Sequence, residues 1–147
     1  MVPIVLRHGG HANKFIADGM LCIFGAPECH ADHAARAVRA AVQIADAVRD
    51  RYGDRLRVGV GVNTGRVLVG TVGGGSRLDF TVIGEPVNTA VRIEAVTRQT
   101  GGDVLVSGTT LARLDGAHDR FVATPSLPLK SPSQPVALYA LTSGTEI

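Results

Sequence analysis

The segment 56–63 reads LRVGVGVN and places glycine at alternate positions, Gly59 and Gly61. Alternate residues of a β-strand point to the same face, so the two glycines leave one face of this strand without side chains. A bare face indicates that another backbone approaches closely, and a helix or a partner chain would fit there. The chain is therefore expected to build a sheet with a close neighbour on this strand.

A long amphipathic helix is the second strong feature. Apolar side chains recur at helical spacing through residues 34–52, which indicates one buried stripe. Asp32 is a plausible N-cap and Gly53 a plausible stop. The stripe consists of Ala34, Val38, Ala41, Val42, Ala45, Val48 and Tyr52.

The other elements form a mixed pattern. Asp-Gly between the short apolar runs of residues 15–24 predicts a hairpin with Asp18 at its tip. Further strands are predicted at 66–73, 79–83, 103–107, 120–123 and 136–141, and helices at 86–100 and 109–114. This order predicts an α+β fold with a ferredoxin-like core, a largely antiparallel sheet and helices on one face. The chain is expected to start at the turn His8-Gly9-Gly10, without an earlier element.

Composition limits the class of protein. A chain of 147 residues suits one domain, here 1–147, and its apolar runs are too short to span a bilayer. A formal net charge of +2 and 4% aromatic residues argue against a nucleic-acid partner, including an RNA-binding module. Cys22 and Cys29 lack a CxxC spacing, which favours reduced thiols and a cytoplasmic location.

Single polar residues leave alternatives open. Asn88 and Arg92 are four apart, so a helix would stack them on one face, where they could serve one ligand or form the polar edge of a packed helix. Asp18 could be a turn former and Lys14 a solvated strand end. A metal site could be drawn from Cys29, His30, Asp32 and His33, but these residues open a helix. The segment NTGRVLVGTVGGG does not fit a Walker loop.

Three longer stretches carry more information together. They read NKFIADGMLCIFGAPE (13–28), RVGVGVNTGRVLVGTVGG (57–74) and DFTVIGEPVNTAVRIEAV (79–96). In this order and spacing the chain resembles the catalytic domain of class III nucleotidyl cyclases, of the bacterial adenylate cyclase type. The resemblance runs from about His8 to Leu141.

The resemblance implies a reaction and a set of binding residues. Such enzymes form a 3′,5′-cyclic nucleotide and pyrophosphate, the 3′-hydroxyl attacking the α-phosphate with the help of two Mg²⁺ or Mn²⁺ ions. Asp18 matches one metal-binding aspartate of the family. Lys14 and Thr81 match the pair that reads the purine, and a lysine has only donors, which suits adenine N1 better than the N1–H of guanine. The implied substrate is ATP and the implied product cyclic AMP.

The remaining family positions concern the ribose and the phosphates. Asn88 matches the residue that orients the ribose, and Arg92 matches the residue that meets charge developing on the α-phosphate. Lys130 resembles a lysine that neutralises the triphosphate, although Ser131 replaces the usual following glycine. Family sites lie between two subunits, so a homodimer or a heterodimer with another cyclase domain is implied.

Two departures affect the expected activity. The family's first strand and helices, with an F-x-D-I-x-G-F-T stretch that carries the second metal aspartate, have no counterpart in this sequence. Ala17 also stands where the family has glycine, at a position where the turn is expected to require positive φ. A truncated domain with one metal ligand absent is expected to be impaired by itself. The alternative is a non-catalytic nucleotide-binding or dimerising signalling module with the same fold.

Overall fold

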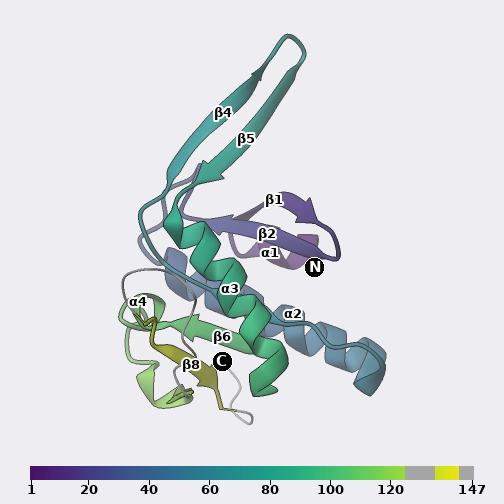
Figure 1. Cartoon of the computed structure of the whole chain (residues 1–147), viewed down its shortest axis with the longest axis vertical. Coiled ribbons are helices and arrows are strands. Elements are labelled where there is room, and N and C mark those ends of the chain that lie inside the picture. The colour runs from purple at the N-terminus through teal and green to yellow at the C-terminus, as the bar shows by residue number, and fades with distance from the viewer. Residues whose placement is uncertain (125–134, 143–147) are drawn as a thin grey trace.

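The computed structural model describes residues 1–124 and 135–142 of the chain (Figure 1). The helices are α1 (Val2–Arg7), α2 (His33–Tyr52), α3 (Glu85–Thr100) and α4 (Gly108–Leu111), with 3₁₀ turns at Gly53–Arg55 and His118–Arg120. The strands are β1 (Gly10–Ile16), β2 (Gly19–Phe24), β3 (Val60–Val62), β4 (Leu68–Gly74), β5 (Arg77–Ile83), β6 (Val104–Ser107), β7 (Phe121–Ala123) and β8 (Leu138–Leu141). The predicted α+β class is confirmed.

The limits of α2 confirm the prediction from the apolar stripe. Asp32 is the N-cap residue, and Gly53 ends the helix with a φ of 57°. Four small residues of the stripe, Ala34, Val38, Ala41 and Ala45, are buried in one core cluster with residues of β3 and β6. Small side chains let this helix lie close to the sheet.

The bare face of β3 lies against α3, so the expected close neighbour of Gly59 and Gly61 is a helix. A Cβ added at Gly61 would lie 2.5 Å from the Glu94 nitrogen and 2.6 Å from the Ala90 oxygen, both on the α3 backbone. A Cβ at Gly59 would meet the side chain of Thr97. Glycine at these positions therefore sets how closely β3 and α3 pack.

The central sheet has the strand order β3-β6-β8-β7. β3 runs parallel to β6, and the β6–β8 and β7–β8 pairs are antiparallel. All four residues of β6 are buried. Val104 and Val106 belong to the cluster under α2, whereas Leu105 belongs to the cluster under α3.

This arrangement corrects the expectation of helices on one face. Because successive strand residues point to opposite faces, α2 and α3 must cover opposite faces of β6, and Figure 1 shows α3 in front of this strand and α2 behind it. The physical reason is the composition of β6, a continuous apolar run with no polar alternation until Ser107. Such a strand requires cover on both sides.

Two antiparallel hairpins accompany the central sheet without pairing to it. β1 pairs only with β2, and β4 pairs only with β5, among the described residues. The β4–β5 hairpin projects away from the rest of the molecule (Figure 1), and every residue of β4 is exposed. Its exposed apolar side chains include Leu68 at 73% and Val72 at 60%.

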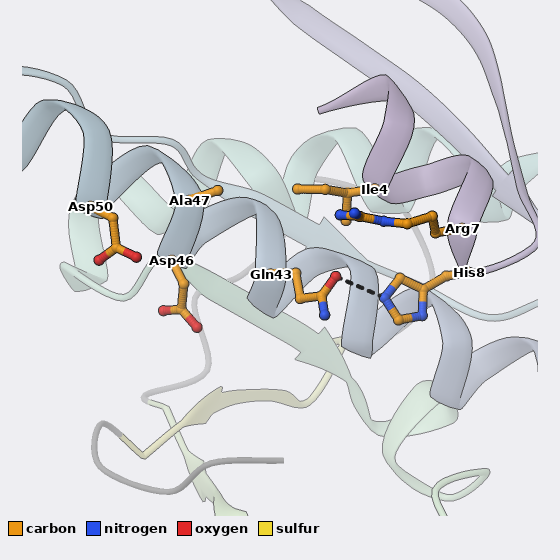
Figure 2. A pocket seen from close by; sticks show the side chains of 7 residues that line it. All are labelled: Ile4, Arg7, His8, Gln43, Asp46, Ala47 and Asp50. Atoms are coloured by element: carbon orange, nitrogen blue, oxygen red, sulfur yellow. Dashed lines mark hydrogen bonds between the residues drawn. The ribbon is translucent and has the colours of Figure 1, made fainter.

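Helix α1 corrects the expectation that no element precedes His8. Its six residues are too few to show a helical period, and Pro3 lies in its first turn. The helix is held by tertiary contacts instead. Val5 is buried, and the His8 ring lies 3.1 Å from the Gln43 side chain of α2 in a hydrogen bond (Figure 2).

Candidate functional site

Asp18 lies at the exposed tip of the hairpin formed by β1 and β2, as predicted. The residue before it, Ala17, has a φ of +52°, the left-handed region that side-chain-bearing residues seldom adopt. The expectation of positive φ at this position is confirmed. The strained turn therefore holds Asp18 between the ends of the two strands, where the residue is exposed.

Lys14 follows an irregularity in β1. Ala12 pairs with Cys22 and Lys14 pairs with Leu21, so Asn13 is an extra residue without an opposite partner. Such a β-bulge re-aims the side chains that follow it. Lys14 and the next residue, Phe15, are both exposed.

Thr81 lies in β5 and is paired with Gly70 of β4. Its hydroxyl has a long hydrogen bond of 3.4 Å to the Asp79 carbonyl oxygen. The neighbouring Phe80 joins this hairpin to the β1–β2 hairpin in two ways. Asn13 donates from Nδ2 to the Phe80 carbonyl oxygen at 2.6 Å, and the His11 ring meets the Phe80 ring edge-on with centroids 5.1 Å apart.

Asn88 and Arg92 lie on α3, one turn apart, as predicted. Neither belongs to the packed face of the helix, which buries Ile93, Val96 and Thr97. Asn88 is exposed, and the Arg92 guanidinium lies 3.7 Å from the Glu85 carboxylate at the start of the same helix. The pair therefore forms a polar flank that is accessible to a ligand.

A cavity of about 720 Å³ opens between the facing edges of β2 and β3, over the alanine-rich face of α2. Asp18 lines it, together with residues of α3 that include Ala90 and Val91. Asp18 is the only predicted site residue in the described part of the chain that lines this cavity, and Lys14, Thr81, Asn88 and Arg92 lie outside its lining. Cys22 of β2 also lines it, and burial raises the pKa of this thiol to about 11.

A second hollow of about 550 Å³ lies between α1 and α2 and contains none of the predicted site residues (Figure 2). It is lined by Ile4, Arg7, His8, Gln43, Asp46, Ala47 and Asp50. The His8–Gln43 hydrogen bond lies in this hollow. The hollow is otherwise the exposed groove between two helices that pack side by side.

At the alternative metal site, at the start of α2, the Asp32 carboxylate is already hydrogen-bonded within the protein. The Asp32 carboxylate accepts a hydrogen bond from Arg36 at 2.7 Å, and this bond lowers the pKa of Asp32. Within residues 1–124 and 135–142, no group of three or more His, Cys, Asp or Glu side chains could hold a metal ion. Lys130 lies outside the described residues.

Asn13 contacts Phe80 but is not among the site residues predicted from the sequence. Asparagine is uncommon within strands, and this was the available signal. Its partner lies 67 positions away, so no local pattern could identify the contact. A membrane-spanning segment was not expected, and in the described part of the chain no helix has the length and apolar character needed to cross a bilayer.

Comparison with known proteins identifies the family. The family model described as "Adenylate and Guanylate cyclase catalytic domain" matches residues 4–143. The uncharacterized protein Rv1318c of Mycobacterium tuberculosis is 37% identical over 142 residues, covering 94% of this chain and 26% of that protein. The uncharacterized protein Rv1319c of the same organism is 37% identical over 114 residues. The chain therefore spans about a quarter of the length of the curated relatives it matches.

Solved structures agree with this assignment. The guanylyl cyclase Cya2 is 34% identical with a TM-score of 0.80, and the match covers 95% of this chain and 73% of Cya2. The adenylyl cyclase CyaB from P. aeruginosa is 26% identical with a TM-score of 0.74, covering 98% of this chain and 77% of that chain. A bacterial light-regulated adenylyl cyclase at 21% identity and a TM-score of 0.78 shares the fold.

Proposed function

The chain belongs to the adenylate and guanylate cyclase catalytic-domain family, and from this premise we propose that it acts in the conversion of ATP to cyclic AMP and pyrophosphate. Domains of this family bind a nucleoside triphosphate, use divalent metal ions and dimerise. In this proposal residues 1–147 belong to a single catalytic domain. The observation that carries it is the accessible polar flank of Asn88 and Arg92 on α3.

The choice of ATP rests on Lys14 and Thr81. Both lie on strands whose neighbouring residues are joined by the Asn13–Phe80 hydrogen bond. The lysine ammonium offers three donors and no acceptor, so it can bind adenine N1 but cannot accept the N1–H of guanine. The threonine hydroxyl can donate or accept, which completes a pair suited to adenine. Because Cya2 is a guanylyl cyclase, the base preference of this chain needs its own test.

Asn88 and Arg92 act on the ribose and the α-phosphate in this proposal. The amide can orient the sugar so that the 3′-hydroxyl faces the phosphorus. The guanidinium presents fixed donors to the charge that develops on the phosphate oxygens. Its ion pair with Glu85 is long and both side chains are partly exposed, so a phosphate can replace the carboxylate at small cost.

Asp18 fits one part of a metal site. Mg²⁺ in nucleotide sites is held by one or two carboxylates together with phosphate oxygens, and an exposed carboxylate on a turn meets that need. Bound ions of this kind stabilise the attacking and leaving oxygens. The described residues offer no larger group of metal ligands, so a two-ion site requires a further carboxylate besides Asp18.

A dimer would explain why the candidate residues are separate. Asp18 lies at the cavity between β2 and β3, whereas Asn88 and Arg92 lie on the outer flank of α3. Two copies related head to tail can place the Asp18 of one against the α3 flank of the other. The exposed apolar side chains of the β4–β5 hairpin supply a contact surface for such a partner.

A second function is favoured by the limited metal-binding capacity of the described residues. A chain that binds ATP and dimerises without turnover would be a signalling module with the cyclase fold. We expect little or no cyclic AMP from this chain alone, because one carboxylate cannot organise two ions.

Mixing experiments separate the two functions. Cyclic AMP formation from ATP with Mn²⁺ is measured for this chain alone and for its mixture with a complete family domain whose own Asn and Arg equivalents are mutated. The same mixture is prepared with Arg92→Ala and with Arg98→Ala. Arg98 is a matched control on the same helix, paired with Glu94 at 3.2 Å.

Three outcomes decide the matter. Product in the mixtures containing the wild-type or the Arg98→Ala chain, and loss of product with Arg92→Ala, supports the catalytic proposal. Product from this chain alone at a rate typical of the family contradicts the two-ion argument. No product in any mixture, from folded samples that bind ATP, supports the non-catalytic module.

A further inference from the structure

Asn13 occupies an unusual position in the β1–β2 hairpin. It is the extra residue of the bulge, between Ala12 and Lys14, each of which has an opposite partner in β2. A bulged residue is free of the strand register, so its side chain can turn toward a neighbouring element. Here the neighbouring element is β5.

The hydrogen bond from Asn13 reaches the peptide group that precedes Thr81. Its Nδ2 lies 2.6 Å from the Phe80 carbonyl oxygen. The peptide group is planar, so a bond to the Phe80 oxygen restrains the group that also contains the nitrogen and Cα of Thr81. The donor itself immediately precedes Lys14. One bond therefore links the side chain of the residue before Lys14 with the backbone of the residue before Thr81.

A second contact supports the same alignment. The rings of His11 and Phe80 meet edge-on, with an interplanar angle of 79°. His11 lies on β1 two residues before Asn13, so both contacts join the same pair of strands. Together they restrain the middle of β5, at the Thr71–Phe80 pair of a hairpin that does not pair with the β1–β2 hairpin through its backbone.

The polar character of Asn13 is not explained by stability alone. Its Oδ1 is buried without a hydrogen-bond partner among the described residues. A buried acceptor without a partner is destabilising, and turning the amide over would place this oxygen against the Phe80 oxygen. A site selected only for packing would favour an apolar side chain. A half-satisfied polar group at a buried position calls for an explanation, and a positioning role for the amide that bonds Phe80 supplies one.

We propose that Asn13 is a positioning residue that sets the base preference of the nucleotide site by holding Lys14 and Thr81 in fixed relation through the Phe80 carbonyl. This inference rests on the proposed function, because it assumes that Lys14 and Thr81 contact the purine. Asn13 does not touch the nucleotide itself. Its loss should weaken discrimination between adenine and guanine and leave the affinity for the triphosphate portion unchanged.

Binding measurements test the proposal without requiring turnover. Isothermal titration calorimetry with Mn²⁺ gives affinities for 3′-deoxy-ATP and 3′-deoxy-GTP, which lack the attacking hydroxyl, and for inorganic triphosphate. The variants are Asn13→Ala, Asn13→Asp, which keeps the shape but removes the donor, and Thr142→Val. Thr142 is a matched control, since its hydroxyl donates to the Arg120 carbonyl oxygen at 3.0 Å, between other elements.

The expected result is a fall of about five- to tenfold in the ratio of adenine to guanine affinity for both Asn13 variants, the effect of one hydrogen bond. Inorganic triphosphate should bind equally to all proteins, and Thr142→Val should keep the wild-type ratio. In a Thr81→Val background, Asn13→Ala should change the ratio by less than about twofold, because coupled residues are not additive.

The other outcomes overturn the inference in distinguishable ways. An unchanged ratio in folded Asn13 variants, or an equal effect with and without the Thr81 hydroxyl, would show that Asn13 has only a structural role, and the proposed function would stand. A wild-type chain that binds neither nucleotide would contradict the proposed function and this inference together.

Discussion

Strand β6 and the β4–β5 hairpin make opposite use of similar side chains. Both contain valine and leucine, yet all four residues of β6 are buried and every residue of β4 is exposed. β6 lies between α2 and α3, whose side chains cover both of its faces. β4 and β5 pair only with each other among the described residues, and Figure 1 shows no helix covering their hairpin.

The two regions have different roles: burial of β6 stabilises the fold, whereas the exposed hairpin serves the proposed association of two subunits. The central sheet obtains its burial within one protomer. The hairpin holds its apolar surface in solvent, where a second subunit can cover it. Thr81 lies on the hairpin, and Asn88 and Arg92 lie on the outer flank of α3. The candidate site therefore lies at the border between these two regions.

The largest expected difference concerns core truncation. Leu105→Ala removes a fully buried side chain from the centre of β6 and should lower the free energy of unfolding by about 2–5 kcal/mol. Leu68→Ala, on the exposed hairpin, should change it by less than about 0.5 kcal/mol. Urea denaturation of both variants checks this, and equal losses would mean that the hairpin packs on the body in solution.

Two glycines sharpen the same contrast. Gly61→Ala places a Cβ against the α3 backbone and should cost about 1–3 kcal/mol, because overpacking displaces a helix. Gly70→Ala, in β4, meets nothing within 4 Å and should be neutral to within about 1 kcal/mol. Thermal unfolding followed by circular dichroism distinguishes them. A tolerated Gly61→Ala would contradict the close contact of β3 with α3.

The proposed role of the hairpin in association gives the third prediction. Leu68→Glu combined with Val72→Glu should weaken self-association at least about tenfold, or about 1.4 kcal/mol, because charges replace the exposed apolar surface. The monomer should unfold as the wild type does. Val122→Glu on β7, an exposed apolar residue of the central sheet, is the control. Sedimentation velocity measures the dimer fraction, and an unchanged fraction would place the interface elsewhere.

The smallest effect concerns an ion-pair cluster beside the central sheet. Burial raises the pKa of Asp103, but hydrogen bonds from Arg49 at 2.6 Å and Arg57 at 3.1 Å outweigh burial and lower it below 3.8. A lowered pKa stabilises the fold above the ordinary carboxyl pKa, and this stabilisation is lost as pH falls below 3.8.

Asp103→Asn should therefore lower the free energy of unfolding at neutral pH by less than about 1 kcal/mol, and the difference from wild type should vanish in acid. Urea denaturation from neutral pH to below 3.8 measures this difference in the free energy of unfolding. Asp115→Asn, at an exposed position, is the control. A difference that persists at low pH would show that Asp103 contributes by packing.

The sequence predicted the parts of the fold that depend on local patterns. The apolar stripe located α2, and the alternate glycines indicated the close neighbour of β3. Helix α1 could not be predicted because its six residues are stabilised by contact with α2. The placement of α2 and α3 on opposite faces depends on tertiary packing of β6, although its continuous apolar run was an available signal.

In the candidate site, too, local patterns predicted the positions of residues, whereas contacts between distant segments could not be predicted. The positions of Asp18 and of the Asn88–Arg92 pair followed from a turn and a helical spacing, while their roles stay predictions. The contact between Asn13 and Phe80 joins residues far apart in the chain, and single-sequence patterns carry no such information. Lys130 lies outside the described residues, so its position is a prediction only.

The parallel pairing of β3 with β6 has a consequence for the order of folding. Val60 aligns with Val104, and the β4–β5 hairpin and α3 lie in the chain between them. Hairpins form from near neighbours in microseconds, whereas a distant parallel pair must first close a long loop. The hairpin should therefore acquire amide protection before β6, and pulse-labelled hydrogen exchange during refolding would reveal the reverse order if β6 forms first. During synthesis, the β4–β5 hairpin, which is proposed to contact a second subunit, would then form before β6 completes the central sheet.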